Sequence, residues 1–137
     1  MPAEPVRQFP EVREYMTPVP HTIAPTSSLS KAIRTMRDHQ VRHLPVVDDD
    51  RVVGVLSQRD ILIMESLPGV NPTEVRVDEA MVRDVYATAP ETPVGEVVET
   101  MIDRKLGSTI VSDGSHVLGV FTTTDALRAL RDLLTRP

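Results

Sequence analysis

Two short polar motifs in this chain have the residue types and spacing to bind a phosphate next to a diol. Ser57 and Asp60 stand three residues apart after an apolar run, and Thr122 and Asp125 repeat the pattern. A hydroxyl residue at a helix start lies beside unpaired backbone amides, which favour a phosphate group. The aspartate one turn later repels phosphate, but its carboxylate can accept two hydrogen bonds from a vicinal diol. A phosphate beside a ribose diol is the outline of a nucleotide.

The same spacing also has a purely structural explanation. Ser/Thr-x-x-Asp is a variant of the capping box, in which side chains satisfy the amides of a helix's first turn. Capping boxes favour Glu or Gln at the last position, whereas both copies here have Asp. This departure weakens the capping explanation, and helix capping and nucleotide contacts both stay open at this point.

Basic side chains near these motifs could complete a phosphate site. Arg59 lies between Ser57 and Asp60 and has the forked donors that phosphate accepts, although a solvated surface arginine explains it equally well. Thr124 takes its place in the second copy. Further basic residues are expected near the strand ends that line the cleft, namely His21, Lys31, Arg42 and His43.

The sequence lacks the usual patterns of catalysis and metal binding. It has no cysteine, nucleophile elbow, P-loop or GxGxxG, and neither Ser57 nor Ser108 has a nearby His/Asp arrangement. Of the four histidines, His39 and His43 are four residues apart, but the helix is expected to end at Gln40–Arg42, so they need not share a face as metal ligands. We therefore predict that the chain is not an enzyme, with no catalytic residue and no metal site.

Both motifs belong to an internal repeat. A shift of 65 residues lays Val12–Leu62 on Val77–Leu127 without a gap, and 15 of the 51 pairs are identical. Two copies are too few for a solenoid. They predict two similar halves that close on each other around a pseudo-twofold cleft.

Each half is expected to run strand–helix–strand–strand–helix, after an extended arm at residues 1–10. In the first half the patterns predict a helical turn at Val12–Met16, an extended His21–Ala24, a helix through Leu29–Met36, strands His43–Val47 and Val52–Leu56, and a helix from Ser57 to about Ser66. In the second they predict a helical turn at Ala80–Asp84, an extended Val85–Ala89, a helix capped by Thr92 with Pro93 first, strands Ser108–Ser112 and Val117–Thr122, and a helix at Thr123–Leu134.

This order resembles the CBS domain, the module named after cystathionine beta-synthase, in tandem. The resemblance rests on the short helix with its Met (Val12–Met16; Val77–Met81), the strand Leu44–Asp48, and Gly-h-h-[Ser/Thr]-x-x-Asp at Gly54–Asp60 and Gly119–Asp125. It implies an α/β (α+β) fold of two β-α-β-β-α repeats related by a pseudo-twofold axis, each a small sheet with two helices on one face. The repeats would span residues 11–67 and 77–134, joined by a linker at 68–76.

The resemblance also implies a function. CBS pairs are regulatory modules that bind an adenine nucleotide (AMP, ADP or ATP-like, with Mg if ATP) between the repeats and signal through dimer geometry to an effector, here unknown. No covalent cofactor is implied. The expected ligand contacts are Ser57, Arg59, Asp60, Thr122, Thr124, Asp125, His21, Thr22, Ile23, His43, Leu44, Pro45, Thr88, Ser108 and Thr109. The alternative is a dimerisation or interaction module with vestigial pockets.

The charge and composition of the chain indicate which classes of partner it can bind. The net charge of −5 argues against nucleic acid. The absence of cysteine, of a signal peptide and of long apolar runs predicts a cytoplasmic protein without membrane contact. The last helix of each half is apolar on more than one side, which predicts a homodimer, with packing of the second face against the sister repeat as the alternative. The residues behind this prediction are Ile61, Met64, Leu127, Leu130 and Leu134.

Overall fold

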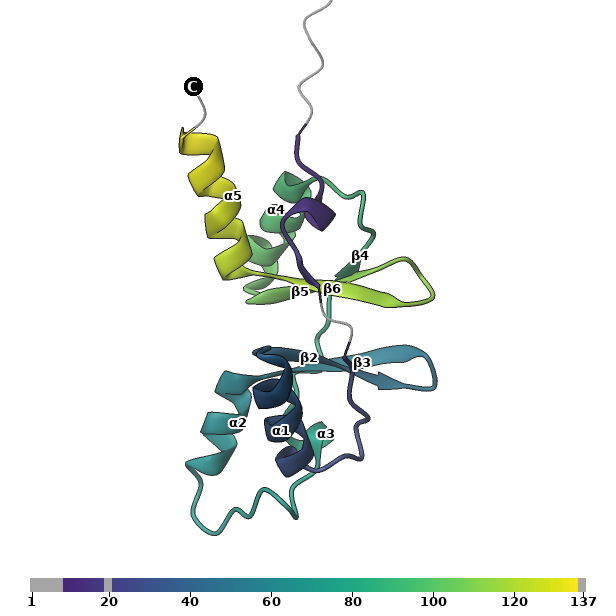
Figure 1. Cartoon of the computed structure of the whole chain (residues 1–137), viewed down its shortest axis with the longest axis vertical. Coiled ribbons are helices and arrows are strands. Elements are labelled where there is room, and N and C mark those ends of the chain that lie inside the picture. The colour runs from purple at the N-terminus through teal and green to yellow at the C-terminus, as the bar shows by residue number, and fades with distance from the viewer. Residues whose placement is uncertain (1–8, 19–20, 136–137) are drawn as a thin grey trace, which may run out of the picture.

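The computed structural model describes residues 9–18 and 21–135. The predicted extended arm, residues 1–10, lies almost entirely outside the described residues. Two units are stacked along the long axis, with their sheets facing each other and their long helices on the outer sides (Figure 1). The predicted α/β fold, with two helices on one face of each small sheet, is confirmed.

The elements follow the predicted order, except that the extended segment predicted at His21–Ala24 forms only an isolated bridge of Ile23 with Val46, and the first strand lies at Thr17–Pro18. The first contains η1 (Val12–Glu14), β1 (Thr17–Pro18), α1 (Leu29–His39), β2 (His43–Asp48), β3 (Arg51–Ser57) and α2 (Gln58–Glu65). The second contains α3 (Val77–Ala80), β4 (Ala87–Thr88), α4 (Val94–Arg104), β5 (Ser108–Ser112), β6 (Val117–Thr122) and α5 (Thr123–Thr135). Within the described ranges, no helix is both long and apolar enough to cross a membrane.

Two predicted boundaries in the second repeat were wrong. The short helix occupies Val77–Ala80 rather than Ala80–Asp84, because the Glu79 carboxylate caps its first turn and Met81 is already extended. Pro93 is the N-cap of α4, not its first helical residue. The Thr92 hydroxyl does not cap this helix, and it accepts a hydrogen bond from the Thr88 hydroxyl at 2.7 Å.

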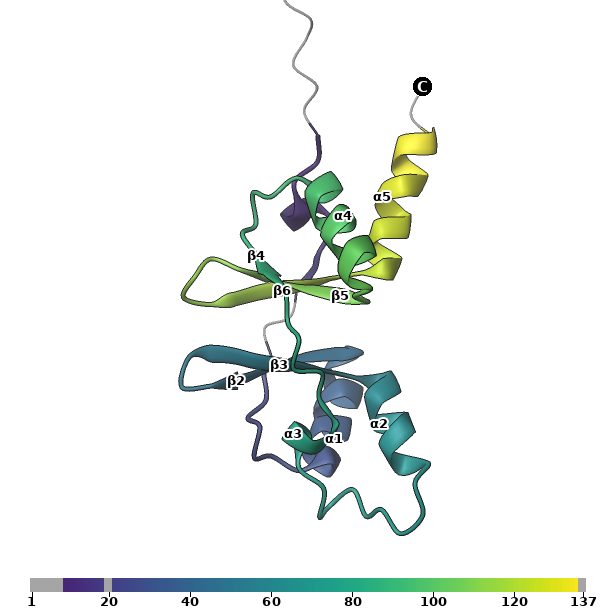
Figure 2. The same ribbon diagram turned by 180° about the vertical axis from the view of Figure 1, so that it is seen from behind.

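The first segment of each repeat packs in the other unit. β1 pairs with β6, so the larger sheet has the order β1-β6-β5-β4, while β2 and β3 form the smaller one. Val12 of η1 lies in the core under α4, and Val77 of α3 lies in the core under α1. Figure 2 shows α3 beside α1 in the lower unit. We propose to keep 11–67 and 77–134 as the sequence repeats, because only their first segments are exchanged.

Two glycines of the repeat make this exchange possible. The β1 segment crosses β6 at Gly119, and a Cβ there would lie 2.6 Å from the Thr17 carbonyl oxygen and 2.8 Å from the Met16 sulfur. Gly54 is in the same position against Met81 and Val82. The identities Met16/Met81 and Gly54/Gly119 in the repeat therefore have one physical cause, a close crossing of two backbones.

Replacing Gly119 with alanine should destabilise this crossing. The new methyl group meets a backbone oxygen that cannot retreat without breaking the pairing of β1, and such overpacking costs about 1–3 kcal/mol. We expect the melting temperature to fall by several degrees. Gly95→Ala in α4 is the control, because its Cβ would meet no atom within 4 Å. Equal melting temperatures for Gly119→Ala and wild type would mean that the crossing is not tight.

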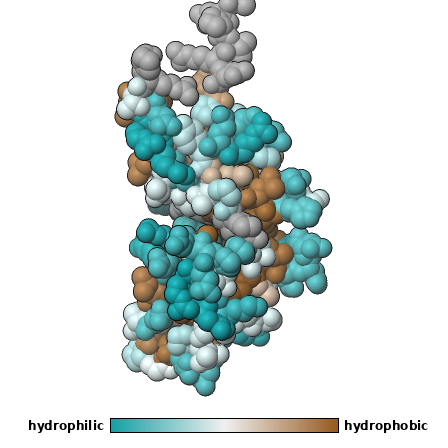
Figure 3. All heavy atoms as spheres, in the orientation of Figure 1, coloured by the Kyte–Doolittle hydropathy of each residue, from teal (hydrophilic) through white to brown (hydrophobic). Residues whose placement is uncertain are grey.

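The two sheets meet through a third apolar cluster, which forms the floor of the cleft between them. Its buried members are Val55, Ile110 and Val120, and Val52, Val85 and Val117 pack around it. On the face drawn in Figure 3 the largest hydrophobic area lies beside the two hairpins, and smaller, separate ones lie along the edge formed by α2 and α5. The exposed residues there are Leu62, Ile63, Leu127, Leu130, Leu133 and Leu134.

Candidate ligand-binding cleft

Two adjoining cavities open between the facing sheets. One has a volume of about 630 Å³ and contains Ser57 and Asp60; we call it the Asp60 cavity. The other has a volume of about 500 Å³ and contains Thr122 and Asp125; we call it the Asp125 cavity. Arg42, His43 and Gly107 line both and form the wall between them.

In the Asp60 cavity the predicted motif forms a reciprocal cap. The Ser57 amide donates to Asp60 Oδ2 at 2.9 Å, and the Asp60 amide donates to Ser57 Oγ at 3.0 Å. Asp60 Oδ1 has no hydrogen-bond partner among the described residues, and the side chain is only half-buried. The capping explanation is therefore realised at this helix start, and one carboxylate oxygen is still free to accept from a ligand.

Three cations line the same cavity as that free oxygen. Arg42, Arg59 and Lys105 line the Asp60 cavity, are exposed, and form no ion pair with any carboxylate in the described part of the chain. Asp84 also lines the cavity, but Arg104 pairs with it. The cavity therefore has an excess of positive charge beside an apolar floor that includes Val55, Val85 and Ile110.

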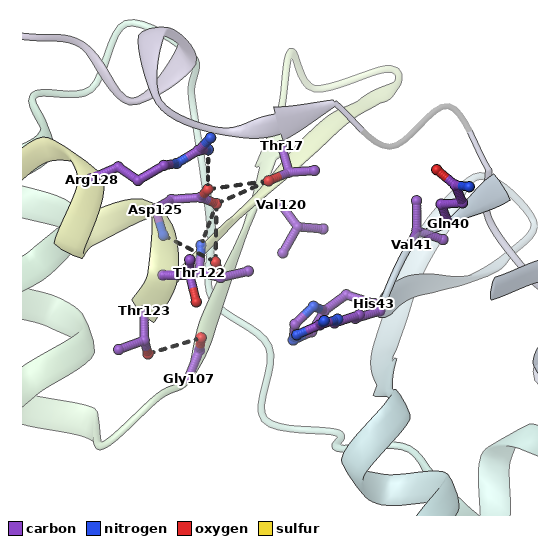
Figure 4. A pocket seen from close by; sticks show the side chains of 12 residues that line it. Thr17, Gln40, Val41, His43, Gly107, Val120, Thr122, Thr123, Asp125 and Arg128 are labelled. Carbon is purple, nitrogen blue, oxygen red and sulfur yellow. Dashed lines mark hydrogen bonds and ion pairs between the residues drawn. The ribbon is translucent and has the colours of Figure 1, made fainter. Parts of the chain in front are cut away.

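The Asp125 cavity contains the same motif, but its carboxylate differs in burial and in hydrogen-bond partners (Figure 4). Asp125 is only 2% exposed. Its Oδ2 accepts from the Thr122 amide at 2.9 Å, and its Oδ1 accepts from the Thr17 hydroxyl at 3.2 Å and from Arg128. Arg128 also donates to the Tyr15 carbonyl at 3.2 Å. Both oxygens of this carboxylate are therefore occupied, and it is tied to the exchanged segment of the first repeat.

The amides at the two helix starts were expected to bind phosphate, but several have protein partners. The Gln58 amide donates to the Arg42 carbonyl at 2.9 Å, and the Asp60 amide donates to Ser57. In the second repeat the Thr123 amide donates to the Gly107 carbonyl at 3.3 Å. A phosphate in either cavity would therefore depend mainly on side chains for its contacts.

The structure brings together about half of the predicted contact residues. Ser57, Arg59, Asp60, His43 and Ser108 line the Asp60 cavity, and Thr122, Thr124, Asp125 and His43 line the Asp125 cavity.

The other predicted contacts lie elsewhere. Ile23 and Leu44 are in the core of the first unit, and Pro45 is buried. Thr109 is 1% exposed and pairs with Phe121 on the helix side of its sheet. His21 stacks on His39 with ring centroids 3.5 Å apart. Thr22 and Thr88 line small cavities near the hairpin turns.

Several lining residues were not predicted. Thr17 and Val82 are brought in by the exchanged segments, and Tyr86 and Asp84 follow on from one of them. Lys105 and Gln40 are equivalent in the repeat and both end a helix in the left-handed conformation, at φ 55° and 54°, but no sequence signal singled out either of them. Arg128 stands one turn after Asp125, a spacing at which opposite charges meet on a helix.

His43 is the titratable group on the shared wall. Burial lowers its pKa, the carboxylates of Asp60 and Asp125 raise it, and Arg42 lowers it again, with burial the largest effect. Within the described ranges, no three His, Cys, Asp or Glu side chains form a group that could hold a metal ion.

Comparison with known proteins matches both halves to one family. The sequence profile of the CBS domain matches residues 12–65 and 77–132. An uncharacterized protein of Methanocaldococcus jannaschii is 30% identical over 130 residues, which is 81% of this chain and 45% of that protein. The chain spans about half or less of the length of such curated relatives.

Solved structures share the fold. CBSX2 in complex with AMP superposes with a TM-score of 0.73 at 24% identity, covering 92% of this chain and 99% of that one. A CBS domain pair in complex with 5′-methylthioadenosine and S-adenosyl-L-methionine superposes with a TM-score of 0.75 at 23% identity, with the same coverage. At these identities the likeness concerns the fold.

Proposed function

Because the chain belongs to the CBS domain family, we propose that it is a regulatory module that binds an adenine nucleotide in the Asp60 cavity. The observation that carries the proposal is one cavity lined by three unpaired cations, Arg42, Arg59 and Lys105, and by a carboxylate with one free oxygen. Cations suit the phosphate, and the free Asp60 oxygen suits a ribose hydroxyl. The site takes no part in catalysis under this proposal.

The ligands in the two related structures all contain an adenosine group. One structure holds AMP, and the other holds two adenosyl compounds. The apolar floor of the Asp60 cavity offers a surface for a base. The unpaired cations favour a phosphorylated ligand over an uncharged or cationic adenosyl compound. We therefore propose AMP, ADP or ATP as the ligand class, with Mg²⁺ entering only as the companion of ATP.

Both carboxylate oxygens of Asp125 already accept hydrogen bonds within the protein, and this gives the two cavities different roles. A ribose diol in the Asp125 cavity would have to displace Thr17, Thr122 or Arg128 from the carboxylate. The two cavities also share Arg42 and His43, so two phosphorylated ligands would compete for the same wall. We therefore expect one nucleotide per chain, bound in the Asp60 cavity.

Replacing Asp60 with alanine should weaken AMP binding by roughly ten- to a hundredfold, because a hydrogen bond to a charged group contributes about 1.5–3 kcal/mol. Isothermal titration calorimetry measures the affinity and the stoichiometry. In a thermal melt, wild type with AMP at a hundred times its dissociation constant should gain about 2.7 kcal/mol, which raises the melting temperature by several degrees. At the same AMP concentration Asp60→Ala should keep at most about half of this stabilisation.

Asp103→Ala is the matched control, because it removes an exposed carboxylate of α4 that lines neither cavity. Its affinity for AMP should equal that of wild type. If no adenine nucleotide at millimolar concentration binds to wild type, the nucleotide proposal is wrong and the alternative of an interaction module with vestigial pockets takes its place. Two nucleotides per chain would contradict the assignment to a single cavity.

We also propose that the module is a homodimer built on α2 and α5. The apolar residues exposed along this edge belong to both units, and Leu127, Leu130 and Leu134 lie at helical spacing on α5. Ile61 and Met64, which contributed to the dimer prediction, pack in the core of the first unit, so Leu62 and Ile63 take their place on α2. A nucleotide bridging the two units would then favour one dimer geometry, which an effector protein could recognise.

A further inference from the structure

At one position of the cleft the two repeats differ in the type of side chain. His43 stands where the second repeat has Ser108, and each pairs across its hairpin with the hydroxyl residue of the motif, Ser57 or Thr122. Ser108 lines only the Asp60 cavity, whereas His43 lines both. Figure 4 shows the His43 ring reaching from β2 across the Asp125 cavity toward Thr122 and Gly107.

Charged and titratable groups face His43 from every element around it. Arg42 precedes it on β2, and Asp60 and Arg59 lie on α2. Asp125 and Arg128 lie on α5, and Asp84, Tyr86 and Lys105 approach from the segments around β4 and α4. Arg128 is paired with Asp125 and Asp84 with Arg104, so the unpaired charges nearest the ligand space are Asp60 and the three cations.

Burial keeps the His43 ring neutral near pH 7 in the free protein, because it lowers the pKa more than the two aspartates raise it. A phosphate held by Arg42 and Arg59 would add negative charge beside the ring and offset the repulsion from Arg42. A nearby anion favours the protonated form of histidine, so its pKa is higher in the complex than in the free protein. A group whose pKa rises on binding takes up a proton, and binding then strengthens as the pH falls toward that pKa.

We propose that His43 takes up a proton when a phosphorylated nucleotide binds in the Asp60 cavity, so that affinity for the nucleotide increases as the pH falls from 8 to 6. This inference rests on the proposed function. It adds that the protein takes up a proton together with the nucleotide. His43 is a positioning and charge-matching residue in this role, not a catalytic one.

Calorimetry with AMP tests the proposal. Titrations of wild type and His43→Gln at pH 6.5, in buffers with different heats of ionisation, give the number of protons taken up per nucleotide. We expect a larger uptake by wild type than by His43→Gln. Between pH 8 and pH 6 the affinity of wild type should rise about three- to tenfold more than that of the variant, since one pKa unit corresponds to tenfold. AMP's own phosphate also titrates near pH 6, but it does so in both proteins.

His116→Gln is the control, because His116 lies in the β5–β6 turn and lines neither of the two large cavities. It should keep the proton uptake of wild type. Equal uptake and equal pH dependence in wild type and His43→Gln would overturn the inference while leaving the proposed function in place. Absence of AMP binding at both pH values would overturn the proposed function and this inference with it. Both proteins are titrated well below the lower of their two melting temperatures, so that a less stable His43→Gln is still compared as folded protein.

Discussion

Replacing Asp125 with alanine is expected to lower the free energy of unfolding by about 2–4 kcal/mol, which makes it one of the most destabilising changes to a polar side chain in this protein. The carboxylate is buried and connects three segments: Thr17 of the exchanged β1, Thr122 at the start of α5, and Arg128 one turn along. Removing it leaves the Thr122 amide and the Thr17 hydroxyl without their acceptor. The guanidinium of Arg128 is half-exposed and can be solvated by water, which keeps the loss below that of a fully buried pair.

Thermal or urea unfolding measures this loss, and Asp60→Ala is the matched comparison. Asp60 makes the same cap in the first repeat, but it accepts no hydrogen bond from a threonine of the exchanged segment and none from an arginine. Loss of a cap alone costs about 1 kcal/mol, so the two alanine variants should differ clearly in stability. If Asp125→Ala and Asp60→Ala have the same melting temperature, the contacts of Asp125 with Thr17 and Arg128 contribute little to stability. The Asp125 cavity would then be as open to a ribose as the other one.

The internal repeat made the fold predictable. Apolar residues at helical spacing placed α1 and α4, and the acidic turn between the strands of the first hairpin is a tight one, with Asp49 and Asp50 at positive φ. These are local signals, because the spacing of apolar residues and the turn residues act within a few positions of the chain. The order of elements therefore followed from the sequence in both halves.

The partners of the first segments did not follow from local signals. Nothing in Thr17-Pro18 or Met81-Val82 indicates which sheet they join, because either sheet offers a strand edge. The close contact with Gly119 or Gly54 decides it, and this contact exists only in the folded protein. The residues Thr17 and Val82, which line the two cavities, were missed for that reason.

The candidate contacts were partly misplaced for a different reason. Side chains of a strand alternate between its two faces, so neighbours such as His43 and Leu44 cannot both reach the cleft. His43 lines it, and Leu44 is completely buried in the helix-side core. Naming whole strand segments as contact residues included both faces. Alternation counted from Ser57, the cross-strand partner of His43, would have separated them.

The last prediction concerns the edge formed by α2 and α5. Leu130 is 48% exposed and Leu127 is 59% exposed, and both belong to the apolar stripe of α5. In a twofold dimer each protomer presents the same surface, so one substitution changes the interface twice. Leu130→Glu would place two unpaired carboxylates in an apolar contact, where burial of a charge is strongly unfavourable. We expect the variant to be a monomer at concentrations where wild type is a dimer.

Light scattering coupled to size exclusion, with and without AMP, measures the mass directly. Ser115→Glu is the control: it adds the same charge at the exposed β5–β6 turn, on the side of the molecule opposite the α2–α5 edge (Figure 1), and should leave the mass of wild type unchanged. The core should tolerate Leu130→Glu, because this side chain is not among the buried residues of either unit. A wild type that stays monomeric at high micromolar concentration in both conditions would rule out this interface. The module would then have to signal through the arrangement of its two units within one chain, for which the shared wall of Arg42 and His43 is the physical link.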